Sequence, residues 1–212
     1  MVVETFTVNP FQENSYICHH EGEAAIIDPG FSNAFEREQA IKYLKDHDLT
    51  ITHLLLTHAH IDHIIDCAYW ADETGLAFEM HEDDLPLLAA SEQQAMMFGV
   101  RMATPPEPDR FLTEDDTIRL GAVEWEIRHV PGHSPGSICF VDRDHGFVIA
   151  GDVLFAGSVG RTDLWRESMP VLLNSIRTKL LTLPDETVVY SGHGPSTTIG
   201  RERETNPFLQ QF

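Results

Sequence analysis

The most informative stretch of this sequence is Leu54-Leu55-Leu56-Thr57-His58-Ala59-His60-Ile61-Asp62-His63. Its leucines end an apolar segment that is typical of a buried strand, and four side chains with metal-binding atoms follow. In extended backbone, residues two apart point the same way, so we expect His58 and His60 to face one ion. A turn into a following helix would bring Asp62 and His63 to a neighbouring position. Imidazole nitrogens and carboxylate oxygens at this density suit zinc, iron or manganese.

Three later apolar segments each end in one further residue of ligand type. The segments are Val130-Pro131-Gly132-His133, Ile149-Ala150-Gly151-Asp152 and Tyr190-Ser191-Gly192-His193. The glycine before each ligand lets the backbone turn sharply and approach an ion closely, and loops at strand ends commonly carry sites. A lone Gly-His or Gly-Asp pair usually marks only a turn. Together with the first stretch, however, these residues provide a set large enough for two neighbouring metal ions.

The composition limits the other classes of function. The chain has 212 residues, of which 42% are hydrophobic and 23% are charged, and we therefore expect a single domain over residues 1–212. The 34 acidic and 14 basic residues give a formal charge of -20, which disfavours nucleic acid and membrane partners. This acidity is ordinary or reflects a high-salt habitat, and the sequence does not distinguish the two.

Location in the cell is predicted from absent signals and from the cysteines. No apolar run is long enough to span a bilayer, and the first ten residues lack a basic leader segment. Cys18, Cys67 and Cys139 are odd in number and far apart, which favours buried free thiols in a reducing compartment. We therefore expect a soluble, cytoplasmic protein whose metal ligands include no cysteine.

Hydrophobic periodicity predicts alternating strands and helices. Strands are expected at 3–8, 15–18, 24–27, 51–56, 117–120, 123–130, 137–141, 147–150 and 187–190. Helices are expected around 35–44, 62–73, 81–98 and 169–181. Two sheets with helices on their outer faces, a four-layer αββα sandwich, would bury this alternation, but periodicity alone does not choose it over a single-sheet α/β fold.

The ligand pattern resembles a known family. The order and context of the ligands are similar to those of the metallo-β-lactamase fold superfamily over nearly the whole chain. The resemblance implies the α+β fold of that family, the αββα sandwich. It also implies two metal sites that share one carboxylate: His58, His60 and His133 for the first ion, Asp62, His63 and His193 for the second, and Asp152 between them.

Other segments narrow the resemblance to one branch. Residues 131–137 and 157–163 resemble the glyoxalase II-like branch and its persulfide dioxygenase relatives. The ending Asn206-Pro207-Phe208-Leu209 resembles the short glyoxalase II-type proteins, so we expect no C-terminal helical domain of the kind that binds glutathione in full-length glyoxalase II. The thiol carrier of the substrate is therefore left open.

The resemblance implies a metal-dependent hydrolase of a thioester such as S-lactoylglutathione. Two divalent ions, with zinc expected before iron or manganese, would share a water and lower its pKa from that of bulk water toward about 7. One ion would polarise the thioester carbonyl, and a thiol with a pKa near about 8.5 makes a good leaving group. Asp62 and Asp152 are the expected catalytic residues, because their charge partly neutralises the ions and keeps the shared water nucleophilic.

Candidates for contact with substrate are less specific. Arg161 lies in a glycine-rich segment and would pair with a substrate carboxylate, or equally with Asp163 as a structural ion pair. We expect four large side chains to pack in the core, with lining of the substrate pocket as the alternative. They are Met96, Met97, Phe98 and Trp165.

Other activities are compatible with the same metal ligands. In a persulfide dioxygenase, only His58, His133 and Asp152 would hold one Fe(II). Lactonase, β-lactamase and phosphodiesterase activities share the dinuclear site, and an inactive metal-binding module would keep the fold alone. The sequence does not determine the substrate, the metal, the occupancy of both sites or the oligomeric state.

Overall fold

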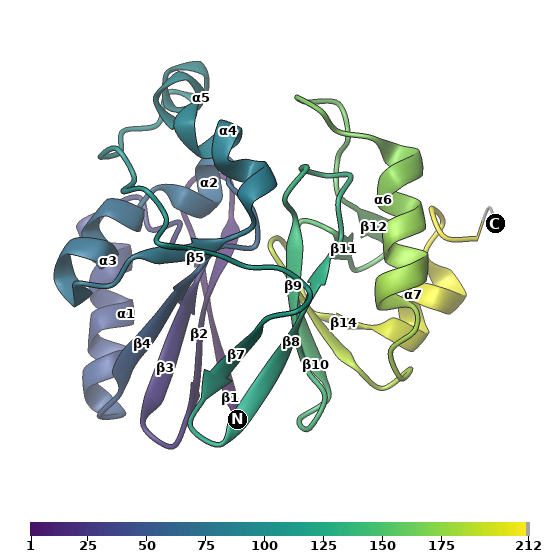
Figure 1. The fold of residues 1–212 in the computed structure, drawn as a ribbon, viewed down its shortest axis with the longest axis horizontal. Coiled ribbons are helices and arrows are strands. Elements are labelled where there is room, and N and C mark those ends of the chain that lie inside the picture. Colours follow the sequence, from purple (N-terminus) through teal and green to yellow (C-terminus); the bar gives the residue numbers. More distant parts are fainter. Residues whose placement is uncertain (211–212) are drawn as a thin grey trace. The chain divides into compact units, whose positions relative to one another are not determined.

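The computed structural model describes residues 1–210, and the chain divides into two compact units. Unit 1 comprises Met1–Leu112 and Arg119–Val123, and unit 2 comprises Thr113–Ile118 and the chain from Glu124 onward. Each unit is described by itself, and its elements can be followed in Figure 1. The single domain expected from the chain length stays a prediction.

Unit 1 contains a six-stranded sheet in the order β1-β2-β3-β4-β5-β6. Its strands are β1 (Val2–Val8), β2 (Glu13–His20), β3 (Glu23–Ile27), β4 (Thr50–Leu55), β5 (Phe78–Met80) and β6 (Arg110–Phe111). The first three strands pair antiparallel, and each pair from β3 to β6 is parallel. Parallel neighbours need crossover connections, which the helices between these strands supply.

The helices of unit 1 bury one face of this sheet. They are α1 (Ala34–Asp46), α2 (Ile61–Ile64), α3 (Cys67–Thr74), the 3-10 turn η1 (Glu82–Asp84), α4 (Leu85–Ala89) and α5 (Ser91–Phe98). Alternate strand residues such as Ile26 and Leu54 pack with Ala40 of α1 and Trp70 of α3 in one core. Every second side chain of a strand therefore points toward the helices and packs against their apolar side chains.

Two long helices expected in unit 1 are each divided. The expected helix 62–73 is interrupted between α2 and α3, where the Asp66 N–H donates to the Pro29 carbonyl at 2.9 Å. The Asp66 carboxylate accepts from Arg37 Nε at 2.7 Å. The expected helix 81–98 is divided into η1, α4 and α5, and at the end of η1 the buried Asp84 carboxylate accepts from the Ala59 N–H. Both breaks serve contacts between distant segments, which a local pattern does not record.

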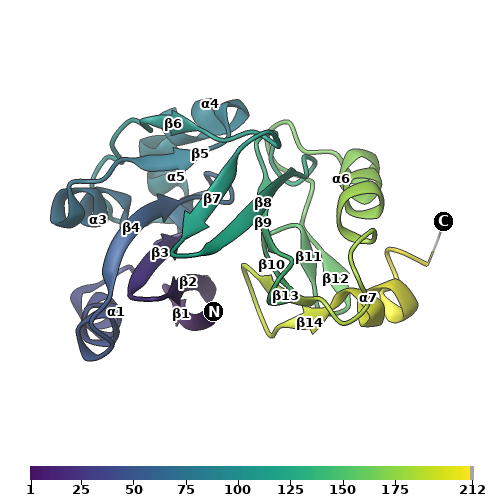
Figure 2. The same cartoon turned by 60° about the horizontal axis from the view of Figure 1, so that its bottom comes forward.

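Unit 2 holds most of a second six-stranded sheet, in the order β14-β13-β10-β9-β8-β7 (Figure 2). Its strands are β7 (Thr117–Leu120), β8 (Val123–His129), β9 (Ile138–Asp142), β10 (Phe147–Gly151), β13 (Val188–Ser191) and β14 (Thr197–Thr198). The pair β10 and β13 is parallel, whereas β9 runs antiparallel to β8 and β10. The presence of two sheets excludes the single-sheet alternative.

Unit 2 also contains a two-stranded ribbon and helices. The ribbon pairs β11 (Leu154–Phe155) with β12 (Ser158–Val159). Helix α6 (Met169–Ser175) continues as the π-helical η2 (Ile176–Leu180), and α7 (Ile199–Thr205) follows β14. Val148 of the sheet, Leu172 of α6 and Ile199 of α7 belong to one apolar core. The ribbon, β14 and α7 were not expected, because strands of two residues leave no periodic signal and α7 buries only Ile199 and Glu202, which form no apolar stripe.

The predictions about the cysteines and about membrane-spanning segments can be compared directly with the structure. All three cysteines are buried and none of them forms a disulfide, as expected. Among the helices of residues 1–210, none combines the length and the apolar character needed to cross a bilayer.

Candidate metal centre

The four predicted ligands of unit 1 lie together after the end of β4. The ring of His58 is centred 4.8 Å from the ring of His60 and 4.1 Å from that of His63. His63 Nε2 lies 3.7 Å from Asp62 Oδ2. All three imidazoles are buried. The structure thus gathers these side chains in one place within unit 1.

A buried carboxylate that the sequence analysis missed, Asp28, supports this group. Its two oxygens accept hydrogen bonds from the Thr57 N–H at 2.7 Å and the Thr57 hydroxyl at 2.6 Å. Asp28 Oδ2 also lies 3.0 Å from His63 Nδ1, and Thr57 Oγ1 lies 3.0 Å from His58 Nδ1. Since the Thr57 hydroxyl donates to Asp28, it accepts from His58, and both imidazoles carry their proton on Nδ1. Nε2 of each ring then has the lone pair that a metal requires.

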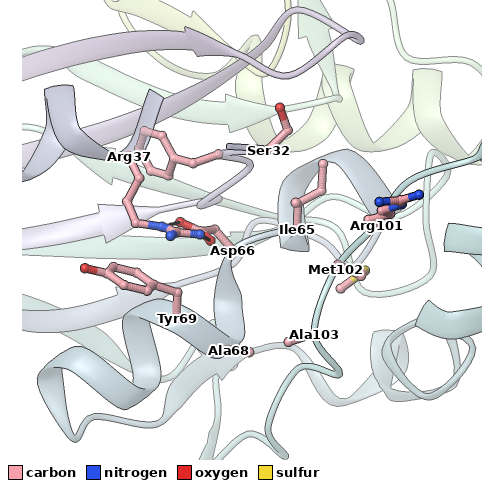
Figure 3. A pocket seen from close by; sticks show the side chains of 10 residues that line it. Ser32, Arg37, Ile65, Asp66, Ala68, Tyr69, Arg101, Met102 and Ala103 are labelled. Atoms are coloured by element: carbon pink, nitrogen blue, oxygen red, sulfur yellow. Dashed lines mark hydrogen bonds and ion pairs between the residues drawn. The ribbon is translucent and has the colours of Figure 1, made fainter. Parts of the chain in front are cut away.

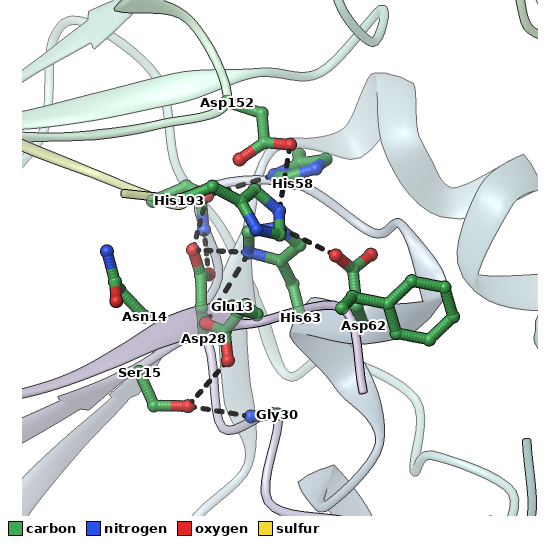
Figure 4. A network of polar contacts seen from close by, with 12 residues as sticks. Glu13, Asn14, Ser15, Asp28, Gly30, His58, Asp62, His63, Asp152 and His193 are labelled. Atoms are coloured by element: carbon green, nitrogen blue, oxygen red, sulfur yellow. Dashed lines mark hydrogen bonds and ion pairs between the residues drawn. The ribbon is translucent and has the colours of Figure 1, made fainter. Parts of the chain in front are cut away.

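Figure 4 shows a second buried acid, Glu13, near Asp28 and His63. Glu13 Oε1 lies 3.8 Å from His63 Nδ1, and Glu13 Oε2 accepts from the Ser15 hydroxyl at 2.9 Å. Burial raises the pKa of the Glu13 carboxyl well above its usual range, with the nearby Asp28 adding to the rise and His63 opposing it. Gly30 packs against this acid so closely that a Cβ there would overlap Glu13 Oε2. The signal for this support was the Asp28-Pro29-Gly30 turn after a buried strand.

The backbone of Ala59, between His58 and His60, is held from another side. Its N–H donates to Oδ2 of the buried Asp84 at 2.9 Å, and its carbonyl accepts from Gln94 Nε2 at 3.3 Å. Gln94 also donates to the Leu87 carbonyl at 2.8 Å. Side chains of η1 and α5 therefore fix both peptide groups of the residue that separates the first two histidines.

The three predicted ligands of unit 2 also meet, although they come from separate strand ends. Asp152 Oδ2 lies 3.6 Å from His133 Nε2 and 3.4 Å from His193 Nε2. These residues follow β8, β10 and β13, as the spacing predicts. Gly132, before His133, has a φ of 133°, and a Cβ there would overlap the backbone of Leu172. A glycine is therefore required where this ligand turns back toward the sheet.

A backbone carbonyl orients His133. His133 Nδ1 lies 2.9 Å from the Arg161 carbonyl, which accepts its proton and leaves Nε2 facing Asp152. Gly160 fits so closely that a Cβ would overlap the Asp152 carbonyl oxygen. The segment 157–161 thus contacts two of the three predicted ligands of unit 2.

The Arg161 side chain makes the ion pair that the sequence offers as one of two alternatives. Its guanidinium donates to Asp163 through Nε at 2.7 Å and through a terminal nitrogen at 2.9 Å. The pairing raises the pKa of Arg161 and lowers that of Asp163. Both side chains are mostly exposed, so the pair contributes little to stability. Binding of a substrate carboxylate by Arg161 stays a prediction.

The prediction that Met96, Met97, Phe98 and Trp165 pack in the core is wrong. Met96 and Met97 are 76% and 77% exposed, and Phe98 and Trp165 are also exposed. On α5, the buried positions are Ser91 and Ala95 instead. Small side chains therefore let this helix approach the body of unit 1, and its large apolar side chains face solvent.

A cavity of about 340 Å³ in unit 1 contains none of the predicted ligands. Figure 3 shows Arg37 and Asp66 facing each other in it, beside Tyr69. The Arg37 guanidinium lies 3.9 Å from the centre of the Tyr69 ring and donates to the Asp66 carboxylate. The Arg37 side chain therefore bonds to groups of the protein itself, which is typical of an arginine that links two helices, here α1 and α3.

The donor chemistry of both groups fits divalent transition metals. Unit 1 offers imidazoles and a carboxylate at one loop, and unit 2 offers two imidazoles around one carboxylate oxygen. The absence of thiolates from both groups argues against a closed structural zinc site. His58 and His63 in unit 1 and His133 in unit 2 carry their proton on Nδ1, which is the arrangement that metal-binding histidines adopt.

Comparison with known proteins identifies similar chains over almost the full length. The sequence profile described as the metallo-beta-lactamase superfamily matches residues 8–193. The hydroxyacylglutathione hydrolase GloC of Haemophilus influenzae is 41% identical over 212 residues, which covers 99% of this chain and 98% of that protein.

Solved structures agree with the sequence comparison. The crystal structure of the BLEG-1 B3 metallo-beta-lactamase has a TM-score of 0.88 and 38% identity, covering 98% of this chain and 99% of that one. The crystal structure of TTHA1623 in a di-iron-bound form has a TM-score of 0.86 and 40% identity, covering 98% of this chain and 100% of that one. These likenesses confirm the fold class that the ligand pattern implied.

Proposed function

The chain belongs to the metallo-beta-lactamase superfamily, and we propose that it is a dinuclear metal-dependent hydrolase of a thioester of the S-lactoylglutathione type. The observation that carries the proposal is the state of the imidazoles. His58 and His63 in unit 1 and His133 in unit 2 each have Nδ1 bonded to an acceptor, which leaves Nε2 for a metal. Such preparation is unnecessary for histidines that only cap or pack.

We assign the ligands as the family pattern implies. In this proposal His58, His60 and His133 would hold the first ion, Asp62, His63 and His193 would hold the second, and Asp152 would serve both. Two bound divalent ions supply Lewis acidity for the thioester carbonyl and a water acidic enough to be a nucleophile near neutral pH. Zinc is the first expectation, whereas the di-iron form of TTHA1623 supports iron equally well.

The residues of this chain contribute orientation and charge. Asp28 fixes His63 directly and His58 through Thr57, so these ligands do not reorganise during the reaction. Asp62 and Asp152 add negative charge that offsets part of the charge of the ions. No nucleophilic side chain is needed, and none is proposed.

The substrate class follows from the relative and from one exposed cation. The printed name of the Haemophilus influenzae relative, a hydroxyacylglutathione hydrolase, supports a hydroxyacyl thioester. We propose that Arg161 binds a carboxylate of the substrate by exchanging its exposed partner Asp163, an exchange that costs little because solvent screens this ion pair. The proposed partner is therefore a small molecule, and buried cysteines that form no disulfide suit a reducing compartment such as the cytoplasm.

Release of thiol from S-lactoylglutathione tests the proposal. The full chain is loaded in turn with zinc, iron and manganese, and the His58→Ala variant and chelator-treated protein serve as controls. We expect thiol release that requires metal and is lost in the variant. No release with any of the three metals would contradict the proposal. Oxygen uptake dependent on glutathione persulfide would instead identify the mononuclear Fe(II) dioxygenase, and hydrolysis of a β-lactam alone would identify a lactamase.

A further inference from the structure

A buried acid on α7 lies outside the predicted ligand set. Glu202 is fully buried, and its Oε1 accepts from the Thr197 hydroxyl at 2.5 Å. Its Oε2 accepts from the Gly157 N–H at 2.8 Å and from Asn206 Nδ2 at 2.8 Å. These three donors are neutral and come from three segments of unit 2. Glu202 therefore connects α7 both to β14 and to the start of the segment 157–161.

Asn206, in the Asn-Pro-Phe ending, makes a second connection to the same segment. It is fully buried, and its Nδ2 donates to the Ser158 carbonyl at 2.9 Å as well as to Glu202. Its Oδ1 accepts from the Phe208 N–H at 3.0 Å. This position needs a donor and an acceptor on one short side chain, which asparagine supplies and aspartate does not.

The segment 157–161 carries this support to a predicted ligand. Its first residues, Gly157 and Ser158, are bonded to Glu202 and Asn206. Within it, the Gly160 N–H donates to the Val153 carbonyl at 3.2 Å. At its last residue, the Arg161 carbonyl accepts from His133 Nδ1 at 2.9 Å. One continuous path of hydrogen bonds and short backbone therefore runs from α7 to the ring of His133.

We propose that Glu202 and Asn206 are positioning residues for His133. They fix the segment 157–161 so that the Arg161 carbonyl stays on Nδ1 and Nε2 remains the ligating nitrogen. The physical reason is that the tautomer of a neutral imidazole is decided by the hydrogen bond that its other nitrogen makes. The inference rests on the proposed metal site and connects to it Glu202 of α7 and Asn206, the residue that follows this helix.

The test compares variants of one network in the full, zinc-loaded chain. Asn206→Ala and Glu202→Leu remove links to the segment 157–161, since leucine has no acceptor for the Gly157 N–H. Thr197→Val is the matched control, since it removes a donor to the same Glu202 carboxylate without touching that segment. Three quantities are measured: the melting temperature, zinc affinity by competition with a chromophoric chelator, and the ¹H–¹⁵N signal of His133 Nδ1–H in histidine-labelled protein. His133→Gln identifies that signal by its loss.

We expect all three variants to melt at lower temperature. Only Asn206→Ala and Glu202→Leu should weaken zinc binding, by about 10- to 100-fold, and broaden the Nδ1–H signal through faster exchange. Equal losses of stability in the three variants, with zinc affinity and signal unchanged, would overturn the inference and leave a purely structural network. Should either variant fail to fold, Asn206→Ser supplies the same comparison with a smaller change.

The readouts separate this inference from the proposed function. A wild-type chain that binds zinc but does not release thiol from S-lactoylglutathione contradicts the proposed substrate, whereas the effect of Asn206→Ala on zinc affinity still supports the positioning role. A wild-type chain that releases thiol while the variants keep its zinc affinity contradicts the positioning role alone.

Discussion

In unit 1 four predicted ligands follow one another within 58–63, whereas in unit 2 three predicted ligands come from the ends of three strands. Their supports differ in the same way. Buried carboxylates, Asp28 and Asp84, hold the ligand loop of unit 1 through its side chains and its backbone. In unit 2 a backbone carbonyl, that of Arg161, orients His133. A contiguous ligand motif can be stabilised by a few buried acids that pack against one loop, while a dispersed set depends on how neighbouring loops are held.

The largest expected effect breaks the support of unit 1. Asp28→Ala removes the acceptor of the Thr57 N–H, the Thr57 hydroxyl and His63 Nδ1–H, and leaves these donors buried. We expect the free energy of unfolding to fall by about 3 kcal/mol or more and zinc affinity to fall by about 10- to 100-fold. Urea unfolding and chelator competition measure the two quantities.

A buried acid of unit 2 provides the matched control for that variant. Asp142 accepts from Trp125 Nε1 at 3.1 Å and from the His145 N–H at 2.8 Å, away from the predicted ligands. Asp142→Ala should lower stability and leave zinc affinity unchanged. Loss of zinc affinity in both variants to the same degree would show that stability alone, rather than ligand orientation, explains the effect of Asp28.

The next effect breaks the close packing of unit 2. In Gly160→Ala the new Cβ overlaps the Asp152 carbonyl oxygen, so the segment 157–161 must move. We expect a loss of about 1–3 kcal/mol in stability and a zinc affinity lower by about tenfold. Gly146→Ala is the control, because a Cβ there meets open space and costs stability only through the positive φ of 69°. Similar zinc affinities for the two variants would contradict the role of this packing.

A smaller effect sharpens the account of the unit 1 loop. Gln94→Ala removes the donor to the carbonyls of the buried residues Ala59 and Leu87. We expect a loss of about 1 kcal/mol in stability and a fall of only a few-fold in zinc affinity, because Asp84 still holds the Ala59 N–H. The neighbouring Gln93→Ala should change neither quantity, and a larger effect of Gln93 would argue against this assignment.

The smallest effect lies outside both ligand groups and concerns pH. Hydrogen bonding from Arg143, with burial opposing it and Arg128 assisting, holds the pKa of Glu126 below its ordinary value of 4.5. A lowered carboxyl pKa stabilises the fold above that ordinary value, and the contribution is lost as the pH falls through the folded pKa. Glu126→Gln should therefore be less stable than wild type by at most about 1 kcal/mol at neutral pH, since the pair is partly exposed.

Unfolding curves from neutral pH down to about pH 3 check this sign. The difference between wild type and Glu126→Gln should shrink as the pH falls, and zinc affinity at neutral pH should be unchanged. A difference that grows toward acid pH would contradict the assignment of the shift to Arg143.

Much of the fold was predictable because apolar patterns locate the strands, and the predicted ligands follow the ends of those strands. Each predicted ligand follows an apolar strand, and the strands at β8, β9, β10 and β13 lie where period-two patterns place them. The helix 62–73 was predicted as continuous, because a single pattern cannot reveal that Asp66 bonds to Arg37 and Pro29 from distant segments. Exposure of Met96 and Met97 was missed for a related reason, since apolar character alone does not say which face of a helix is covered.

The ligand candidates were readable from spacing, and their supports were not. Asp28 lies 35 residues from His63 in sequence, and Gly157 lies 45 residues from Glu202. Only the folded chain brings such pairs together. Asn206 was noticed through resemblance, but its bond to the Ser158 carbonyl gives the physical reason for an asparagine at that position.

The number of metal ions per chain tests most directly whether the two ligand groups act as one dinuclear centre. Elemental analysis of the full chain, purified after loading with zinc, should give two ions per chain for wild type. Asp62→Ala and His193→Ala, one from each unit, should each retain about one ion and lose thiol release from S-lactoylglutathione. One ion per chain in wild type, with full activity kept in both variants, would contradict the dinuclear assignment.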